Sequence, residues 1–582
     1  MALTARESGY YVLYVDGEVV SGHAAEREAI ERGQPYADAG RSVHYVHEYV
    51  VDITAADDAP ETPDDADDSG GEPDDGPIIE PGEDHDYPDA RVEANIGGEM
   101  FAITVPAGQR AQDGRLTAFN DPIVGVPLEN MLADNRETLA GRYRVMLGDR
   151  VICDDDIEIH AKCRTRPQRD WEPTPLSEPN RSLFLDYGDQ AAGADWTGIY
   201  DDGDNGPMGI GYLNPAMETT GERPEIGPRM GQDAAAMCGA DDNLLAVVRG
   251  MADAAGPWPY HHLDPQTLDY IDTRDHPRAT TLWAADGSDN PIAIGSDSPL
   301  SLSQAAAHAP AFGVGGYAFY GSEFDRQNMI GWALYTARLW QNPAYCARDG
   351  RSVSGPDRNG WMHGQVRGIA WSLRCLVDAH IVAPDNALVQ MMLDDLADSM
   401  VYLFENKRPG PVWYLTSGGY YNKEGMAPYQ WDFLTWAMAH AVNHGQNKYR
   451  RLLEKMAPLT LQRVNHRLPE LAPVYSVVYE RDGERLYSWD AMLNATAERS
   501  GDMREALKCE PGSQALQDIF GNGRPGDFLG NPGSGSGYAA IFGMALAGCA
   551  QVGVEGAADA YGKWLKRSRC NFSWNPQYGV RA

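Results

Sequence analysis

The sequence predicts a multidomain protein with a small α+β unit, an acidic linker, a small all-β domain and a large, mainly α-helical domain. Three observations lead to this fold class. Residues 9–53 and 91–163 alternate apolar and polar side chains as strands do, residues 57–89 are strongly acidic, and residues 303–582 repeat apolar side chains every three or four positions. At roughly 150 residues per domain, a chain of 582 residues is long enough for this organisation.

Residues 1–54 form the predicted α+β unit. Strands are expected at 10–15 and 18–21 around an Asp16-Gly17 hairpin turn, followed by a short helix at 24–32 and a strand at 43–51. So short a unit buries little core, and we therefore expect it to dock on a partner or on another copy.

Residues 55–90 form the predicted linker. Fifteen Asp or Glu residues lie between Asp57 and Asp89, with Pro and Gly among them and no Lys or Arg. Like charges repel along such a chain and extend it. A calcium-binding tract is the alternative, but the ordered Asp-x-Asp-x-Asp-Gly loop is missing.

Residues 91–163 predict a β-sandwich-like domain. Segments 101–105 and 143–147 alternate as half-buried strands, and 151–152 and 157–159 follow them. Six or seven short strands at this spacing are typical of a small sandwich or barrel.

Residues 164–582 form the predicted helical domain, whose first part, 164–300, is rich in loops. A short strand is expected at 183–185 and a helix near 242–254. Successive helical hairpins without a fixed-length repeat predict an (α/α) toroid. Its helices are expected at 327–340, 365–381, 388–404, 431–443, 448–456, 488–497, 538–552 and 557–567.

Composition excludes several classes of partner. A formal net charge of −37 argues against nucleic acid and anionic lipid, because phosphate contacts need clusters of Lys and Arg. No signal peptide and no run of eighteen apolar residues is visible, so we expect no membrane insertion. The eight cysteines show no CxxC spacing, and Cys153 with Cys163 is the one locally plausible disulfide.

The loops of the helical domain are aromatic. Aromatic faces stack on the apolar faces of sugar rings while polar neighbours bond the hydroxyls, although such residues can also simply fill the ends of a toroid. The predicted substrate-binding residues are Trp258, Trp361, Trp413, Tyr420, Tyr429, Asp432 and Trp574.

A catalytic hypothesis concerns β-elimination, which needs a base for the proton beside a uronate carboxylate and a group that neutralises that carboxylate. The candidate residues are His308, His363, Arg367, Tyr421 and Asn422. His308 could instead cap a helix, and Arg367 could pair with Asp432.

A glycoside hydrolase would need two carboxylates about 5–10 Å apart, which sequence spacing cannot pair. His440 and His444 lie one helical turn apart, but without a third ligand we expect no metal and no cofactor.

Three blocks carry a resemblance. They are His308-Ala309-Pro310 followed by Tyr317, Tyr320 and Gly321; residues 365–374, Gln-Val-Arg-Gly-Ile-Ala-Trp-Ser-Leu-Arg; and residues 427–436, Ala-Pro-Tyr-Gln-Trp-Asp-Phe-Leu-Thr-Trp. Together they resemble poorly characterised tailed-bacteriophage virion proteins of the tail or fibre that carry an (α/α) toroid related to heparinase- and alginate-lyase-like folds. Tyr429 stands where that pattern has Trp, and Ser322 follows Gly321 where it has Thr-Gly.

The resemblance implies a tail-tip or tail-fibre protein, made in the host cytoplasm and carried on the virion. Residues 1–54 would dock on other tail or baseplate proteins, and the toroid would present its cleft to host surface polysaccharide as a receptor-binding surface. A homo-oligomer is expected. A polysaccharide lyase or hydrolase of the same fold is one alternative, and a purely structural virion scaffold is another.

Overall fold

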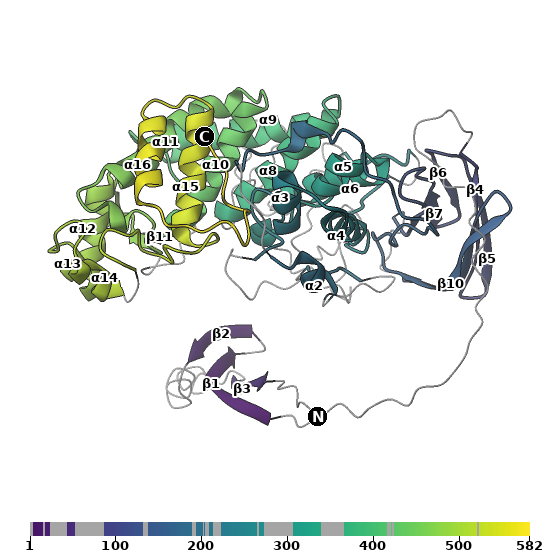
Figure 1. Ribbon diagram of the computed structural model, residues 1–582, viewed down its shortest axis with the longest axis horizontal. Coiled ribbons are helices and arrows are strands. Elements are labelled where there is room, and N and C mark those ends of the chain that lie inside the picture. The colour runs from purple at the N-terminus through teal and green to yellow at the C-terminus, as the bar shows by residue number, and fades with distance from the viewer. Residues whose placement is uncertain are drawn as a thin grey trace. The chain divides into compact units, whose positions relative to one another are not determined.

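The computed structural model divides the chain into two compact units, Met1–Ile79 and Glu80–Ala582 (Figure 1). The structure describes residues 4–15, 18–23, 43–52, 87–131, 138–188, 194–201, 203, 209–213, 223–264, 267–272, 306–338, 366–415, 421, 424–520 and 523–582.

The first unit contains an antiparallel sheet in the order β2-β1-β3. Its strands are β1 (Thr4–Val15), β2 (Glu18–His23) and β3 (Val43–Asp52), each somewhat longer than the sequence predicts. Strands β1 and β2 are two residues apart, the spacing that a tight hairpin needs. The helix expected at 24–32 and nearly all of the acidic linker lie outside the described residues.

In its described residues the second unit begins with seven strands in two sheets. The larger sheet has the order β10-β9-β4-β5 and the smaller one the order β6-β7-β8. Along β4 every second side chain is buried, because one face of the sheet covers an apolar core and the other meets solvent. The strands are β4 (Ala90–Ile96), β5 (Glu99–Val105), β6 (Arg110–Asp113), β7 (Leu116–Phe119), β8 (Leu128–Glu129), β9 (Leu139–Leu147) and β10 (Arg150–Ile159).

A buried junction centred on Glu129 joins these strands to the helices. Nε of Arg110 lies 2.7 Å from Glu129, and Nε of Arg164 lies 2.9 Å from it. Arg164 also donates to the side chain of Gln327 in α6 at 2.6 Å. Burial raises the pKa of Glu129, but the two guanidinium groups outweigh it and hold the pKa below its usual value. The strands are therefore part of the same compact unit as the helices.

The rest of the unit is mainly helical, so the prediction of a small sheet region followed by a larger helical part is confirmed. In Figure 1 the strands lie at one end of this unit and α12–α14 at the other. The helices are η1 (Arg181–Leu183), α2 (Trp196–Asp201), α3 (Gly231–Cys238), α4 (Asp242–Asp253), η2 (Ala306–His308), α5 (Val314–Tyr320), α6 (Glu323–Arg338), α8 (Val366–Val382), α9 (Ala387–Tyr402), the π-helical η4 (Leu403–Lys407), α10 (Pro428–Asn443), α11 (Lys448–Asn465), η6 (Pro469–Leu471), α12 (Trp489–Arg499), α13 (Gly501–Ala506), α14 (Gln514–Phe520), α15 (Tyr538–Gln551) and α16 (Ala557–Arg567). Two short ladders, β11 (Gly425–Met426) with β12 (Val477–Val478) and β13 (Glu480–Arg481) with β14 (Glu484–Arg485), lie among them.

Helices α8, α10 and α15 form an inner row, and α9, α11 and α16 pack outside it. The inner helices are buried nearly all round, whereas α9, α11 and α16 each bury one face. The inner helices run parallel. Near the start of each helix, Arg367 of α8 contacts Gln430 of α10. Eleven residues later in α8 and ten in α10, Asp378 contacts His440.

Most predicted helices appear within a few residues of their expected bounds. Helix α11 runs on to Asn465 where the sequence predicts an end at 456, and it continues through Pro458. Pro458 has no N–H, so one hydrogen bond of this helical turn is missing. In the same turn the backbone N–H of Trp413 donates to the Lys455 carbonyl at 3.0 Å. The strand predicted at 183–185 is wrong, because this segment begins with the 3₁₀ turn η1.

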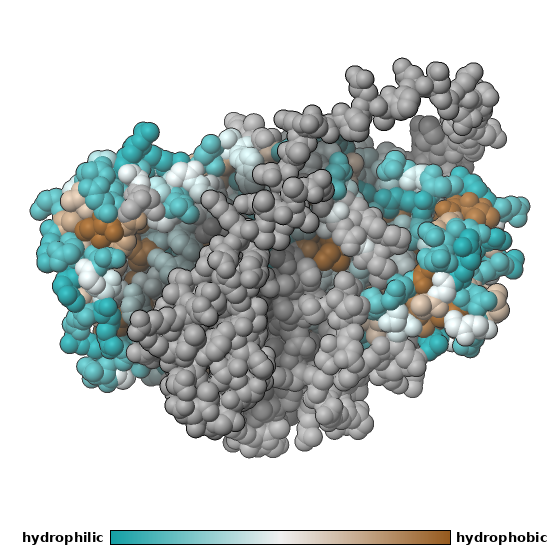
Figure 2. Space-filling view, turned by 90° about the horizontal axis from the view of Figure 1, so that it is seen from below, coloured by the Kyte–Doolittle hydropathy of each residue, from teal (hydrophilic) through white to brown (hydrophobic). Residues whose placement is uncertain are grey.

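The described cysteines, including Cys153 and Cys163, are free thiols, so the locally plausible disulfide is absent. None of the helices in the described part of the chain combines the length and the apolar character that crossing a membrane requires. On the face shown in Figure 2 the described residues are mostly hydrophilic, and the hydrophobic ones gather in small separate patches.

Substituting Glu129→Gln should lower the free energy of unfolding by about 3–5 kcal/mol, because Arg110 and Arg164 then keep their charges without a buried counter-charge. The matched control is Glu405→Gln. Glu405 pairs with Arg451 at 2.5 Å, but their side chains are 41% and 60% exposed, so the loss should be at most about 1 kcal/mol. Urea denaturation followed by tryptophan fluorescence measures both changes, and equal losses would contradict the role of the junction.

Candidate functional site

The amino-terminal ends of α10 and α15 meet at one end of the inner row. Tyr429 in the first turn of α10 lies with its ring 5.1 Å from that of Tyr538, the first residue of α15. The residues that precede these helices, Ala427 and Gly537, offer no side-chain acceptor to the first N–H groups. Helix starts without such a cap leave N–H groups and partial positive charge at this end. Oxygen-bearing ligands are favoured there.

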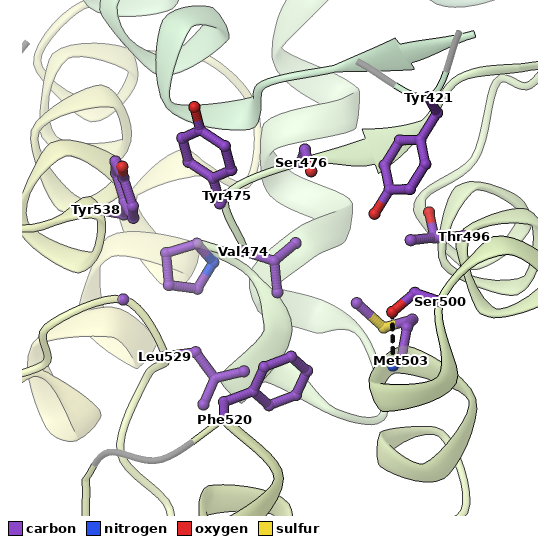
Figure 3. A pocket seen from close by; sticks show the side chains of 12 residues that line it. Tyr421, Val474, Tyr475, Ser476, Thr496, Ser500, Met503, Phe520, Leu529 and Tyr538 are labelled. Carbon is purple, nitrogen blue, oxygen red and sulfur yellow. Dashed lines mark hydrogen bonds between the residues drawn. The ribbon is translucent and has the colours of Figure 1, made fainter. Parts of the chain in front are cut away.

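A pocket of about 240 Å³ opens beside these helix ends (Figure 3). Tyr421, Thr496 and Ser500 lie on one side of it and Tyr475 and Tyr538 on the other. This volume is below the range of roughly 300–1,000 Å³ that is usual for sites of drug-sized ligands, and it leaves room for about one sugar-sized ring. The lining residues are Tyr421, Pro473, Val474, Tyr475, Ser476, Thr496, Ser500, Met503, Phe520, Leu529, Gly530 and Tyr538. We call this the tyrosine pocket.

Three tyrosines pack together at its edge. The Tyr475 ring stacks on Tyr429 at 5.9 Å with an interplanar angle of 14°, and it lies 5.7 Å from Tyr538. Tyr475 is 42% exposed and Tyr429 is 3% exposed. Tyr475 therefore offers an aromatic surface to a ligand, and Tyr429 supports it from beneath.

Tyr421 is held in an unusual backbone conformation. Its φ of 48° lies in the left-handed region, which non-glycine residues seldom adopt. Glu424 N–H donates to the Tyr421 carbonyl at 3.2 Å, and the ladder of β11 with β12 follows at once. Strand β12 itself comes directly after Tyr475 and Ser476. The pairing thus fixes both pocket-lining segments against each other.

A cationic cluster lies at the amino-terminal end of α8, formed by Arg223, His308 and Arg367. Arg223 pairs with Glu225 at 3.0 Å, and the Arg367 N–H donates to Gln430 at 3.4 Å. Gln430 in turn donates to the Tyr429 hydroxyl at 3.3 Å, which links this cluster to the tyrosines.

His308 is neutral in this cluster. It is 7% exposed, and neither ring nitrogen has a hydrogen-bond partner among the described residues. Burial lowers its pKa to about 3, and the charges of Arg367 and Arg223 contribute to the shift. An imidazole with this pKa accepts protons weakly.

Arg374 of α8 positions the cluster. Its guanidinium donates to the carbonyls of Ala309 at 2.7 Å, Pro310 at 2.8 Å and Gly227. Ala309 and Pro310 are the two residues after His308, and Gly227 lies two residues after Glu225. One buried side chain therefore holds both segments on the helix that carries Arg367.

The structure locates three of the five predicted catalytic residues. His308 and Arg367 lie in the cationic cluster, and Tyr421 lines the tyrosine pocket. His363 and Asn422 lie outside the described residues, as do the predicted substrate-binding residues Trp361 and Tyr420. Tyr429 lies under the exposed ring of Tyr475 rather than in the pocket lining.

Asp432 and Trp258 correct the substrate-binding prediction, because both belong to the core. Asp432 is fully buried and pairs with Arg463 through both carboxylate oxygens, at 2.5 and 3.0 Å. It therefore does not pair with Arg367 either. Trp258 packs against Phe312 and Trp332 at centroid distances of 5.1 and 6.0 Å.

Two further tryptophans have different outcomes. Trp413 is buried and stacks on Phe404 at 5.1 Å with a 7° angle, while Arg451 covers its ring at 5.5 Å. It is a packing residue, which corrects its predicted role in substrate binding. Trp574 is 57% exposed and lies 6.4 Å from Trp196, so it remains accessible.

Sequence reasoning missed Tyr475, Ser476, Tyr538 and Arg223. The first two lie in a loop without periodicity, although the tyrosine between Val474 and Ser476 is an aromatic loop residue of the predicted kind. The sequence predicts Tyr538 only as the first residue of a helix. Arg223 is remote in sequence from every other residue of the cluster.

A second polar cluster lies at the other end of α8 and α10. Asp378 accepts from Arg229 at 3.0 Å and lies 3.0 Å from Nε2 of His440. The His440 and His444 rings are 4.7 Å apart. Within the described ranges no three His, Cys, Asp or Glu side chains group as metal ligands. Arg229, Asp378 and His440 are buried and join α8 to α10, whereas His444 is half-buried.

No protein-family model matches the chain, and no curated protein or solved structure is significantly similar to it.

His308 should make the folded state less stable in acid. Its pKa is lowered from 6.5 to about 3, so on acidification the unfolded chain gains a proton that the folded state does not take up. Above pH 6.5 His308 is neutral in both states and does not lower the free energy of unfolding. As the pH falls from 6.5 toward about 3, protonation of His308 in the unfolded chain lowers that free energy progressively. Urea unfolding at pH 7, 6, 5 and 4 should show that the wild type loses more stability than His308→Gln. Parallel pH profiles would show that the imidazole titrates normally.

Proposed function

We propose that this protein binds a glycan through the tyrosine pocket, as a tail-tip or tail-fibre component with which a tailed bacteriophage recognises a host-cell surface. The observation that carries the glycan proposal is the pocket itself. It combines an exposed ring, Tyr475, with the hydroxyls of Tyr421, Ser476 and Tyr538 in a volume of about 240 Å³.

The chemistry of this lining matches that of a sugar. A pyranose has an apolar face of C–H groups, which packs on an aromatic ring, and an equatorial rim of hydroxyls, which needs donors and acceptors. Tyr475 supplies the ring, with Tyr429 stacked behind it. The surrounding hydroxyls both donate and accept, as sugar hydroxyls do.

The virion setting is supported by the order of the chain and by the resemblance of its sequence blocks. A short sheet unit comes first, an acidic segment follows, and the helices that carry the pocket come last. In this proposal the first unit docks on other tail proteins, the helical hairpins belong to an (α/α) toroid, and the assembled form is a homo-oligomer.

A polysaccharide lyase is the second candidate, favoured by the cationic cluster. Arg367 could neutralise a uronate carboxylate, and the neutral imidazole of His308 lies beside it. The low basicity of His308 makes it a poor general base near neutral pH. For that reason binding is the leading proposal.

The test applies the purified full-length chain to surface polysaccharides from candidate hosts. Saturable binding without chemical change supports the receptor-binding proposal. A rise in absorbance near 232 nm would identify a lyase, and a rise in reducing ends alone would identify a hydrolase. Absence of binding and of turnover would contradict both functions and favour a scaffold.

Tyr475→Ala should weaken binding of the recognised polysaccharide about tenfold or more, because it removes the exposed ring on which the sugar packs. Leu565→Ala is the matched control. Leu565 on α16 is 43% exposed, close to the 42% of Tyr475, and does not line the pocket. Calorimetric titration of both variants measures the change, and an equal effect of the two substitutions would contradict the assignment of the pocket.

A further inference from the structure

The tyrosine pocket has two chemically different parts. Its polar part consists of Tyr421, Tyr475, Ser476 and Tyr538, whose side chains carry hydroxyl groups. Its apolar part consists of Val474, Met503, Phe520 and Leu529, three of them buried. Figure 3 shows Val474, Phe520 and Leu529 grouped together, away from the hydroxyls of Tyr421 and Thr496. We call these four residues the apolar floor.

The hydroxyls of Thr496 and Ser500 are hydrogen-bonded within the protein. Thr496 Oγ1 donates to the Met492 carbonyl at 2.7 Å and accepts from Val478 N–H at 2.8 Å. Ser500 Oγ accepts from Met503 N–H at 3.3 Å. The bonds of Thr496 tie α12 to β12, and the bond of Ser500 caps the start of α13, so Thr496 contributes mainly its methyl group and its bulk to the lining.

An unsubstituted hexose fits such a lining poorly. It carries a hydroxyl or hydroxymethyl group around its whole edge, and a hydroxyl pressed on the apolar floor would lose its water without gaining a partner. A methyl group in the same place gains from leaving water. At this place the apolar floor therefore favours a sugar with a methyl group over one with a hydroxyl group.

We infer that the pocket selects a sugar that bears a methyl group and seats that methyl on the apolar floor. Two sugar classes supply it, the acetamido group of an N-acetylhexosamine and the C6 methyl of a 6-deoxyhexose. The inference rests on the proposed glycan-binding function and narrows it to a substrate class. In the first case the amide N–H and C=O also match the hydroxyls at the polar part of the pocket.

The test titrates the full-length protein with two matched pairs of sugars, N-acetylglucosamine against glucose and L-rhamnose against L-mannose. N-acetylglucosamine carries an acetamido group where glucose has its C2 hydroxyl, and L-rhamnose carries a C6 methyl where L-mannose has a hydroxymethyl group. The methyl-bearing member of at least one pair should bind about tenfold more tightly, the size of discrimination that one apolar group provides. The pair that shows the preference identifies the source of the methyl.

A second measurement needs no variant. In saturation-transfer NMR the methyl protons of the preferred sugar should receive the strongest saturation, because they lie closest to the protons of the floor. Strongest transfer to ring protons, with the methyl weakest, would overturn the inference.

Val474→Thr tests the floor directly, since it replaces a methyl by a hydroxyl with almost no change of shape. The preference for the methyl-bearing sugar should fall to about threefold or less. Val477→Thr is the matched control, because Val477 is a buried valine three positions away that does not line the pocket. An unchanged preference in Val474→Thr, or an equal loss in the control, would overturn the inference.

The two proposals fail in different ways. If both members of each pair bind equally and Tyr475→Ala abolishes that binding, the glycan-binding proposal stands and the methyl selection is wrong. If no sugar and no host polysaccharide binds, both are wrong.

Discussion

The buried guanidinium of Arg374 is the interaction on which the arrangement of this end of the helical domain depends. It is fully buried and lies 4.9 Å from the centroid of the Trp371 ring. Its N–H groups donate to carbonyls of two segments that are distant in sequence. A planar guanidinium has five N–H donors in fixed directions, so it holds two chain segments in a more defined geometry than the rotatable ammonium of a lysine. The segments carrying Arg223 and His308 reach α8 through this side chain.

The parallel inner helices bring the segments held by Arg374 to the same end of the domain as the tyrosine pocket. Because α8 and α10 run in register and α10 and α15 start side by side, residues from three separate parts of the chain arrive at one end. Loops at that end can vary while the rows beneath them stay packed, which is the usual division between scaffold and binding surface. Tyr429 shows the division within a single residue: its helix fixes it in the core, and its face supports the exposed Tyr475.

The helices could be predicted from sequence because burial on one face leaves a period that a short window reveals, as for α9 and α16. The site could not be predicted to the same extent. Asp432 looked like a polar loop neighbour of aromatic residues, yet its partner Arg463 lies 31 positions away and no local pattern signals that pair. Likewise, Trp258 and Trp413 have the composition of a sugar-binding loop, but burial is decided by contacts with Phe312 and Phe404. Arg367 and His308, both catalytic candidates from the sequence, lie in one cluster, and their catalytic role stays a prediction. Arg223 joins them only through the fold.

The Glu129 junction has a mechanical meaning. Arg110, Arg164 and the side chain of Gln327 connect the strands to the helices. With the covalent connection alone, the strands could move relative to the helices. A load applied to the strands is therefore shared among several short, buried bonds before it reaches the helices.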